Sequence, residues 1–214
     1  STGETHIVAR GFGDDNRRTL SCLQTLGASI TEVDTGFRIV GNREALSEPI
    51  KVLDCGNSAT TMRLLLGVCA GLGLKARFDG DASLRARSMQ SLIDIFAGCG
   101  IDIVSQNGCA PLELRGGTFK GGKVILPHAS AQLKSALLVA ALAAQKTVEI
   151  VEPGESRDHT ERMLAMAGQA QIIEVPAEKI PPIIPSAQTA PAALTSKALE
   201  FGVLPVPTCN AMLA

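Results

Sequence analysis

An internal repeat is the feature of this 214-residue sequence that most constrains its fold. A short polar run followed at once by an apolar helical pattern occurs twice, at residues 53–66 and 127–138. Each copy leads into a short strand pattern, at 75–78 and 147–151, with the same spacing in both copies. Two matching segments with matching spacing predict a repeated supersecondary unit.

The repeat continues with a polar turn, a second helix and a closing glycine. Copies of this pattern end at Gly27, Gly100 and Gly168, where a glycine suits the position after a helix. In the first two copies a β-hairpin is expected next, over 29–40 and 101–114, and the second contains an Asn-Gly turn signal. The sequence therefore predicts repeated βαβαββ units of about 70 residues, in the α/β (α+β) fold class.

The chain divides into two parts by composition. Residues 1–168 are predicted to form one lobe of repeated units, with the chain opening inside a unit. Seven of the eleven prolines lie after Gly168, so residues 169–214 are interpreted as a divergent Pro/Ala-rich segment that could pack on the same lobe. Within it, one short helix is expected over 192–201, before Gly202.

Composition and charge exclude several kinds of function. A formal net charge of -1 gives no reason to expect nucleic acid or an acidic membrane as a partner, and an aromatic content of 3% without Trp or Tyr argues against base-stacking platforms. The six cysteines form no CxxC pair and no metal-ligand spacing, which favours free thiols in a reducing cytoplasm. No signal peptide or bilayer-spanning run is recognised, so a soluble protein without membrane contact is expected.

The start of each repeated helix is a candidate anion site. Residues 57–58 and 129–130 place small polar side chains where free backbone N–H groups and a partial positive charge meet. The simpler alternative is that these residues only cap their helices. The nearby cations Arg63, Arg87 and Lys134 favour the anion site. Arg63 and Lys134 fall inside helices, however, and could equally be surface charges.

A hydroxyl and a guanidinium also occur together ahead of two further helices, at residues 83–87 and 156–157, which again suits an oxyanion. Asp158 and Glu161 are interpreted as an acidic capping box, and hence as structural. His159 is interpreted as a surface residue, because no Ser or Cys partner accompanies it. The sequence contains no catalytic-triad pattern, phosphate-binding loop or dinucleotide fingerprint.

Four motifs, in this order, resemble the enolpyruvyl transferase family. They are LDCGNSATTMRLLLG at 53–67, FDGDASLRARSM at 78–89, LPHASAQLKSALLVAAL at 126–142 and VEPGESRDHTERML at 151–164. The third and fourth favour the branch that acts on shikimate 3-phosphate, and the alternative is the branch that acts on UDP-N-acetylglucosamine. The resemblance implies an inside-out α/β barrel lobe, one of two lobes that enclose the substrates in a cleft.

The resemblance also implies a reaction. An enolpyruvyl group would pass from phosphoenolpyruvate to the 5-hydroxyl of shikimate 3-phosphate by addition and elimination, in aromatic amino acid biosynthesis. Phosphate would be released, and no metal or organic cofactor would be needed. The matching motif positions assign no catalytic residue to this chain. They assign substrate-binding roles to Asn57, Ala59, Arg63 and Arg87 on the phosphoenolpyruvate side, and to Ser130, Ala131, Gln132, Ser156 and Arg157 on the shikimate 3-phosphate side.

Ala59 departs from the family pattern, because many members have glycine at this position. The added methyl group would intrude on the inhibitor glyphosate, which is longer than phosphoenolpyruvate. We therefore expect the protein to tolerate glyphosate.

Two parts of the family pattern are not recognised in the sequence. A Lys-Ser segment that contacts both substrates is expected ahead of Ser1, and the second lobe, which carries the proton-transferring residues, is not found in residues 169–214. We therefore expect activity where self-association, a partner chain or a complementing second lobe completes the cleft. The alternative is a non-catalytic lobe that binds shikimate 3-phosphate.

Overall fold

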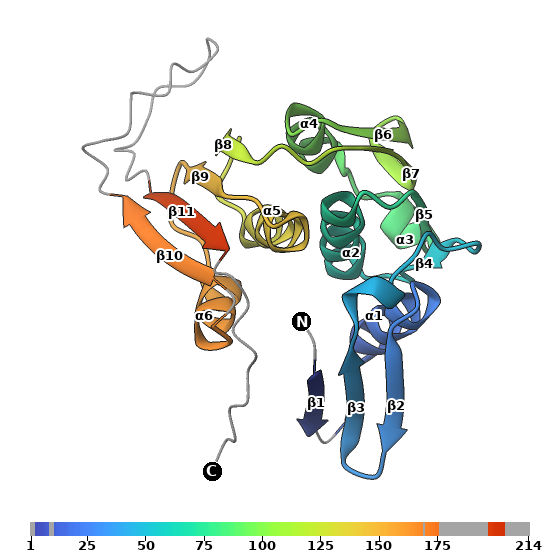
Figure 1. The fold of residues 1–214 in the computed structure, drawn as a ribbon. Coiled ribbons are helices and arrows are strands. Elements are labelled where there is room, and N and C mark those ends of the chain that lie inside the picture. The colour runs from blue at the N-terminus through green and yellow to red at the C-terminus, as the bar shows by residue number, and fades with distance from the viewer. Residues whose placement is uncertain (1–2, 9–10, 169, 176–196, 204–214) are drawn as a thin grey trace.

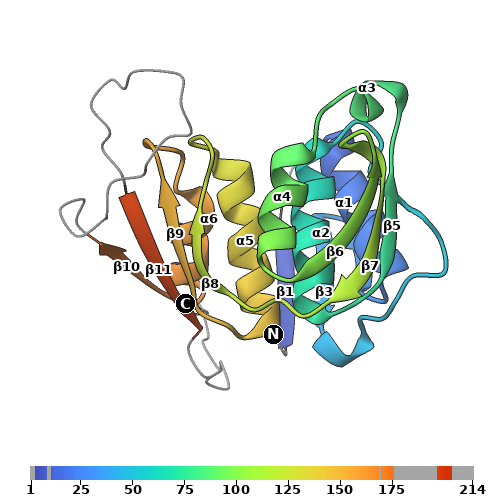
Figure 2. The ribbon, with the colours of Figure 1, turned by 90° about the horizontal axis from the view of Figure 1, so that it is seen from above.

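Three β-sheets lie around a group of helices (Figure 1). The computed structural model describes residues 3–8, 11–168, 170–175 and 197–203. Seen from above, the helices stand between the sheets (Figure 2). This mixed α/β arrangement, with helices inside and sheets outside, is the fold class predicted from the sequence.

The second repeated unit has the complete βαβαββ order. Its sheet runs β4-β5-β7-β6, with β4 parallel to β5 and the other pairs antiparallel. Its elements are β4 (Leu53–Asp54), α2 (Ala59–Leu72), β5 (Ala76–Asp79), α3 (Ala82–Arg85), α4 (Gln90–Gly98), β6 (Ile101–Gln106) and β7 (Cys109–Gly117). The single helix expected before Gly100 is interrupted between α3 and α4, where the Met89 amide donates a hydrogen bond to the Gly108 carbonyl oxygen over 2.7 Å.

The third unit repeats this order. Its sheet runs β8-β9-β11-β10, again with the first pair parallel and the others antiparallel. Its elements are β8 (Gly122–Ile125), α5 (Ala131–Ala144), β9 (Val148–Glu152), α6 (His159–Met166), β10 (Ala170–Val175) and β11 (Lys197–Val203). A strand pair therefore follows the second helix here too, although the sequence analysis expected a hairpin only in the first two copies.

The short helix expected over 192–201 is wrong where the structure describes it, because residues 197–203 form strand β11. Residues 192–196 lie outside the described part of the chain. β11 pairs with β9 on one side and β10 on the other, so its backbone hydrogen bonds are made between strands. The apolar residues Leu199, Phe201 and Val203 also alternate, which is typical of a strand rather than a helix.

The first unit contains the last four elements of the same order. They are β1 (Gly3–Val8), α1 (Asp14–Thr25), β2 (Ser29–Val33) and β3 (Gly36–Gly41), followed by a short 3-10 helix, η1 (Arg43–Ala45). The sheet runs β1-β3-β2 and is antiparallel, which matches β5-β7-β6 and β9-β11-β10 in the other two units. The expected hairpin at 29–40 is confirmed.

Helices α2 and α5 pack closely because small residues face one another. A Cβ added at Gly67 would collide with the carbonyl oxygen of Ala136, and one added at Gly71 would collide with that of Ala140. The two glycines on α2 therefore let its backbone lie directly against α5. This close approach brings the first turns of the two helices together.

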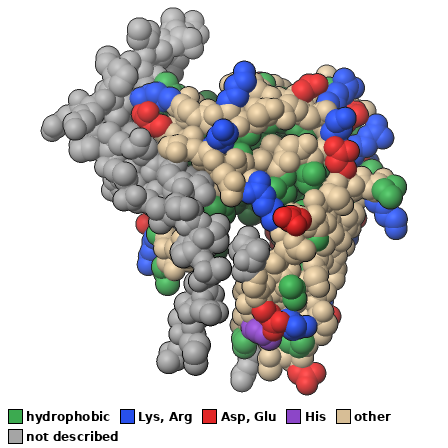
Figure 3. Space-filling view, viewed as in Figure 1, with side chains coloured by type: hydrophobic (Ala, Val, Ile, Leu, Met, Phe, Trp, Pro, Cys, Tyr) green, Lys and Arg blue, Asp and Glu red, His purple; other side chains and the backbone are tan. Residues whose placement is uncertain are grey.

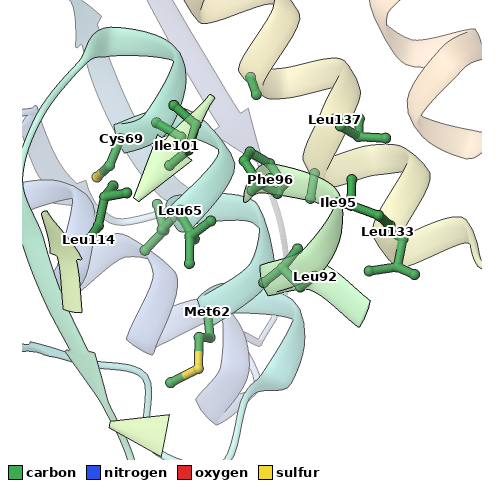
Figure 4. Close-up of a cluster of buried hydrophobic side chains, with 14 of the residues drawn as sticks. Met62, Leu65, Cys69, Leu92, Ile95, Phe96, Ile101, Leu114, Leu133 and Leu137 are labelled. Carbon is green, nitrogen blue, oxygen red and sulfur yellow. The ribbon is translucent and has the colours of Figure 1, made fainter. Parts of the chain in front are cut away.

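One continuous hydrophobic core joins the central helices to the sheets. In Figure 4, Met62 and Leu65 of α2, Phe96 of α4 and Leu137 of α5 belong to the same buried cluster. Cores of this kind provide most of the stability of a domain. The helices that carry the predicted site residues are therefore fixed by packing.

Charged side chains are interspersed on the surface. On the face shown in Figure 3, Lys and Arg side chains alternate with Asp and Glu side chains. Among the described elements, no helix combines the length and the apolar character needed to cross a membrane. The described cysteines are free thiols: Cys22, Cys55, Cys69, Cys99 and Cys109.

Candidate functional site

A pocket of about 220 Å³ lies where α2, α5 and the start of α6 meet. Its lining residues come from three separate parts of the chain: Thr60, Arg63 and Leu64; Ala131, Gln132 and Ser135; Arg157, His159 and Thr160. Four of the predicted substrate-binding residues are among them. Concave sites with a few converging polar side chains are the usual places for small ligands in proteins, so this pocket is the candidate site.

Gln132 links the first turns of α2 and α5. Its Nε2 donates a hydrogen bond to Thr60 Oγ1 over 2.8 Å, and its Oε1 accepts one from Arg63 Nη1. Thr60 and Arg63 lie three residues apart on α2, so both side chains are on the same face of that helix. Two polar residues of one repeat copy therefore bind one polar residue of the other.

Two arginines bring positive charge to this region. Burial, and then the neighbouring charge of Arg87, hold the pKa of the Arg63 guanidinium below its usual value. Arg87 Nη2 donates a hydrogen bond to Asn57 Oδ1 over 2.9 Å, and Asn57 Nδ2 donates one to Asp81 Oδ2 over 3.1 Å. Asn57 and Arg87 do not line the pocket, but they are paired with each other beside it. An anion beside a partly buried guanidinium, such as that of Arg63, offsets its repulsion by a like-charged neighbour.

Ser58 and Ser130 cap their helices, whereas the anion site at the same helix starts stays a prediction. Ser58 Oγ accepts a hydrogen bond from the Thr61 amide over 3.2 Å, and Ser130 Oγ accepts one from the Leu133 amide over 3.4 Å. Ser130 is therefore placed by its capping role, directly ahead of the pocket residue Ala131.

Ala59 is the first residue of α2 and is only 6% exposed. It belongs to the hydrophobic core and is not among the residues that line the pocket. Its role toward glyphosate stays a prediction. Ser156 also does not line the pocket, because its hydroxyl donates a hydrogen bond to Glu152 Oε2 over 2.8 Å. The neighbouring Arg157 does line it.

Lys134 is buried, so the hypothesis that it is a surface charge is wrong. Its side chain is 2% exposed, and its Nζ lies 2.8 Å from Glu152 Oε1 and 2.6 Å from Glu161 Oε1. The capping box is also wrong: Asp158 makes no side-chain capping hydrogen bond, and Glu161 contacts the buried ammonium instead. A buried carboxylate gains more from an ammonium than from one helical N–H group. One signal in the sequence is that Lys134 is the only charged residue in α5.

Sequence reasoning missed several polar residues of the pocket. Thr60 and Ser135 are in the lining, and Ser135 Oγ lies 2.7 Å from Thr160 Oγ1. His159 is exposed, as expected, yet it also lines the pocket. The repeat carried a usable signal, because Thr60 corresponds to Gln132 and Arg63 to Ser135 when the two copies are aligned. Both copies therefore turn the same repeat positions toward the pocket.

Comparison with known proteins identifies the family. The family model of EPSP synthase (3-phosphoshikimate 1-carboxyvinyltransferase) matches residues 1–196. This chain belongs to the EPSP synthase family. The 3-phosphoshikimate 1-carboxyvinyltransferase of Caulobacter vibrioides is 41% identical over 175 residues, and that of Synechococcus sp. strain RCC307 is 43% identical over 182 residues. These matches cover 81% and 82% of this chain.

Solved structures of the EPSP synthase family show the same fold. The 2.37 Å structure of EPSP synthase from Acinetobacter baumannii superposes with a TM-score of 0.74 and 35% sequence identity, over 80% of this chain and 40% of that one. The chain likewise spans 40% of the Caulobacter relative and 41% of the Synechococcus relative. The described fold is thus part of the family's fold. These relatives support the shikimate branch rather than the UDP-N-acetylglucosamine alternative. Within the described residues, no group of three or more His, Cys, Asp or Glu side chains is arranged to hold a metal ion.

Proposed function

We propose that the pocket between α2, α5 and α6 binds shikimate 3-phosphate and phosphoenolpyruvate as one side of an active site, and that a second lobe completes it. In the completed enzyme the 5-hydroxyl oxygen of shikimate 3-phosphate adds to the enolpyruvyl group, and elimination then releases inorganic phosphate. The net result is a new carbon–oxygen bond to shikimate 3-phosphate and a broken one to phosphate. Binding and orientation are the contribution of this chain.

One observation carries the proposal. Arg63 of α2, Gln132 of α5 and Arg157 of the segment between β9 and α6 line one pocket, within a chain that belongs to the EPSP synthase family. A guanidinium can bind a phosphate or carboxylate through two parallel hydrogen bonds, and both proposed substrates carry such groups. Holding two reactants in one geometry lowers the barrier to their reaction, but proton transfer still needs an acid and a base from elsewhere.

The proposal is tested in two steps on the purified chain. Isothermal titration calorimetry with shikimate 3-phosphate measures binding, and we expect saturable binding that Arg157→Gln weakens but leaves measurable. A phosphate-release assay with both substrates then measures turnover, before and after addition of a separately expressed second lobe from a family member. We expect turnover only in the mixture. An absence of binding would overturn the proposal, and binding without turnover in the mixture would establish the non-catalytic alternative.

We further propose that the protein works in the cytoplasm. The described cysteines are free, and four of them are buried, which suits a compartment that keeps thiols reduced. Localisation of a fluorescent fusion tests this proposal. Fluorescence confined to a membrane or to an oxidising compartment would contradict it.

A further inference from the structure

Three charged side chains are buried together where α5, β9 and α6 meet. Lys134 of α5, Glu152 at the end of β9 and Glu161 of α6 have side chains that are 2%, 2% and 5% exposed. The Lys134 ammonium lies 2.8 Å from one carboxylate and 2.6 Å from the other. We call these three residues the Lys134 cluster. It joins three elements, two of which, α5 and α6, also meet through the Ser135–Thr160 hydroxyl contact.

The Lys134 cluster anchors both ends of the segment that carries Arg157. Residues 153–158 connect β9 to α6, so Glu152 comes directly before this segment and Glu161 shortly after it. Ser156, inside the segment, donates a hydrogen bond to Glu152 Oε2 over 2.8 Å. The segment is therefore linked to the Lys134 ammonium group by Glu152 at its start and by Glu161 after its end. Its middle is linked indirectly, through the hydrogen bond from Ser156 to Glu152.

Charge attraction in the Lys134 cluster outweighs the cost of burying its ammonium group. Burial by itself lowers the pKa of Lys134, but its hydrogen bonds and ion pairs with Glu152 and Glu161 outweigh this and raise the pKa above its ordinary value. Lys134 is therefore charged, and it faces two carboxylates. Both depend on the same cation, and breaking a buried pair leaves an uncompensated charge. Such a cluster therefore favours one arrangement of α5, β9 and α6 over other arrangements of the same three elements.

We propose that the Lys134 cluster is a positioning element that holds residues 153–158 so that Arg157 stays at the wall of the pocket. Lys134 is only two residues from Gln132 on α5, so the same helix that presents Gln132 also fixes the segment opposite. The identity of the ligand in the test rests on the proposed function, whereas the position of the segment does not.

The test compares Glu161→Ala with Glu161→Gln in the full chain. Glu161→Ala removes the ion-pair contact with Lys134, whereas Glu161→Gln keeps a side-chain oxygen of the same reach without the negative charge. We expect Glu161→Ala to weaken binding of shikimate 3-phosphate about tenfold and Glu161→Gln to restore most of that loss. In an Arg157→Gln background, Glu161→Ala should have no further effect on the affinity. A merely structural role would lower the affinity by the same factor in both backgrounds, and that result would overturn the proposal.

A second measurement needs no ligand. Amide hydrogen exchange of peptides that cover residues 153–158 should be faster in Glu161→Ala, and also in Ser156→Ala, which cuts the link without leaving a buried charge. Phe119→Leu is the control, because Phe119 is buried against Phe96 and away from the pocket. It should leave the exchange of this segment unchanged. If the unmodified chain fails to bind shikimate 3-phosphate, the proposed function falls and exchange alone decides the positioning role. Wild-type exchange in both variants would overturn that role.

Discussion

Arg63 is a half-buried arginine on α2 whose guanidinium hydrogen-bonds Gln132 and is repelled by the charge of Arg87. A guanidinium in this position has given up part of its hydration and has gained a like-charged neighbour. An anion that binds beside it replaces the lost water and relieves the repulsion. At the scale of single residues, a bound anion would therefore offset both the desolvation of Arg63 and its repulsion by Arg87.

The first prediction concerns the planar guanidinium group of Arg63. Arg63→Lys keeps the charge but removes the planar donor group, so it should weaken binding of a phosphorylated substrate by about 2 kcal/mol. Calorimetric titration with each proposed substrate measures the loss. Arg77→Lys is the matched control, because Arg77 on β5 is exposed and lies near Glu113, away from the pocket. Equal affinity of Arg63→Lys and the unmodified chain would show that Arg63 contacts no ligand.

The second prediction concerns Ala59, which is 6% exposed at the first position of α2. In the complemented enzyme, Ala59→Gly should increase inhibition by glyphosate, because it removes the methyl group that we expect to restrict the longer inhibitor. Glyphosate titrations at fixed phosphoenolpyruvate measure the change. Glycine also costs a helix about 1 kcal/mol, so the melting temperature is recorded alongside. Unchanged inhibition by glyphosate would falsify this role of Ala59.

At the scale of elements, the crossing of α2 and α5 determines where the pocket lies. Gly67 and Gly71 lie directly against the carbonyl oxygens of Ala136 and Ala140, so the two helix backbones are as close as their atoms allow. Only at this separation can Gln132 on α5 reach residues of α2. The small residues of the crossing therefore determine the geometry of the polar residues at its end.

The third prediction follows from this contact. Alanine normally stabilises a helix relative to glycine, but Gly67→Ala should destabilise the protein by about 2 kcal/mol, because the new methyl group has no space. Gly98→Ala is the matched control, because Gly98 is also helical and has no atom within 4 Å of an added Cβ. This substitution should stabilise the protein by about 0.5 kcal/mol. Urea unfolding followed by circular dichroism measures both. Equal effects of the two substitutions would contradict the close crossing.

The sequence predicted elements that are defined by local patterns. The helices that begin after Ser58 and Ser130 were recognised from their caps and apolar runs, and the Asn-Gly turn marked one hairpin. Strand β11 was missed although Leu199, Phe201 and Val203 alternate, because so short a run becomes a strand only by pairing with β9, which lies far away in the chain. The predicted pocket residues came from motif likeness. Their convergence, and the burial of Lys134, depend on how α2, α5 and α6 pack, which no local pattern encodes.

At the scale of the whole molecule, the described sheets of the three units differ in size and in burial. The second and third have four-stranded sheets with the same strand order, whereas the first has three strands. β1 is exposed at every residue, whereas β9, which has the equivalent place in its sheet, is mostly buried. The Lys134 cluster lies in the third unit, beside the mostly buried β9.

The last prediction concerns global stability. Lys134→Met should lower the free energy of unfolding by about 3 kcal/mol at neutral pH, because two buried carboxylates lose their only cation within the described structure. Lys123→Met is the matched control: Lys123 lies 2.6 Å from Glu149, but the pair is partly exposed and should contribute less than about 1 kcal/mol.

The stabilising effect of Lys134 should decrease as the pH rises. Folding raises the pKa of Lys134 above its ordinary value of 10.5, so its stabilising effect is fully present below that pH and is lost as the pH rises through the higher folded value. Urea midpoints of the unmodified chain should therefore fall toward those of Lys134→Met as the pH is raised above 10.5. The difference between the two proteins isolates Lys134 from the other lysines, which titrate in both. A difference that stays constant across this range would show that Lys134 acts through its packing alone, without its charge.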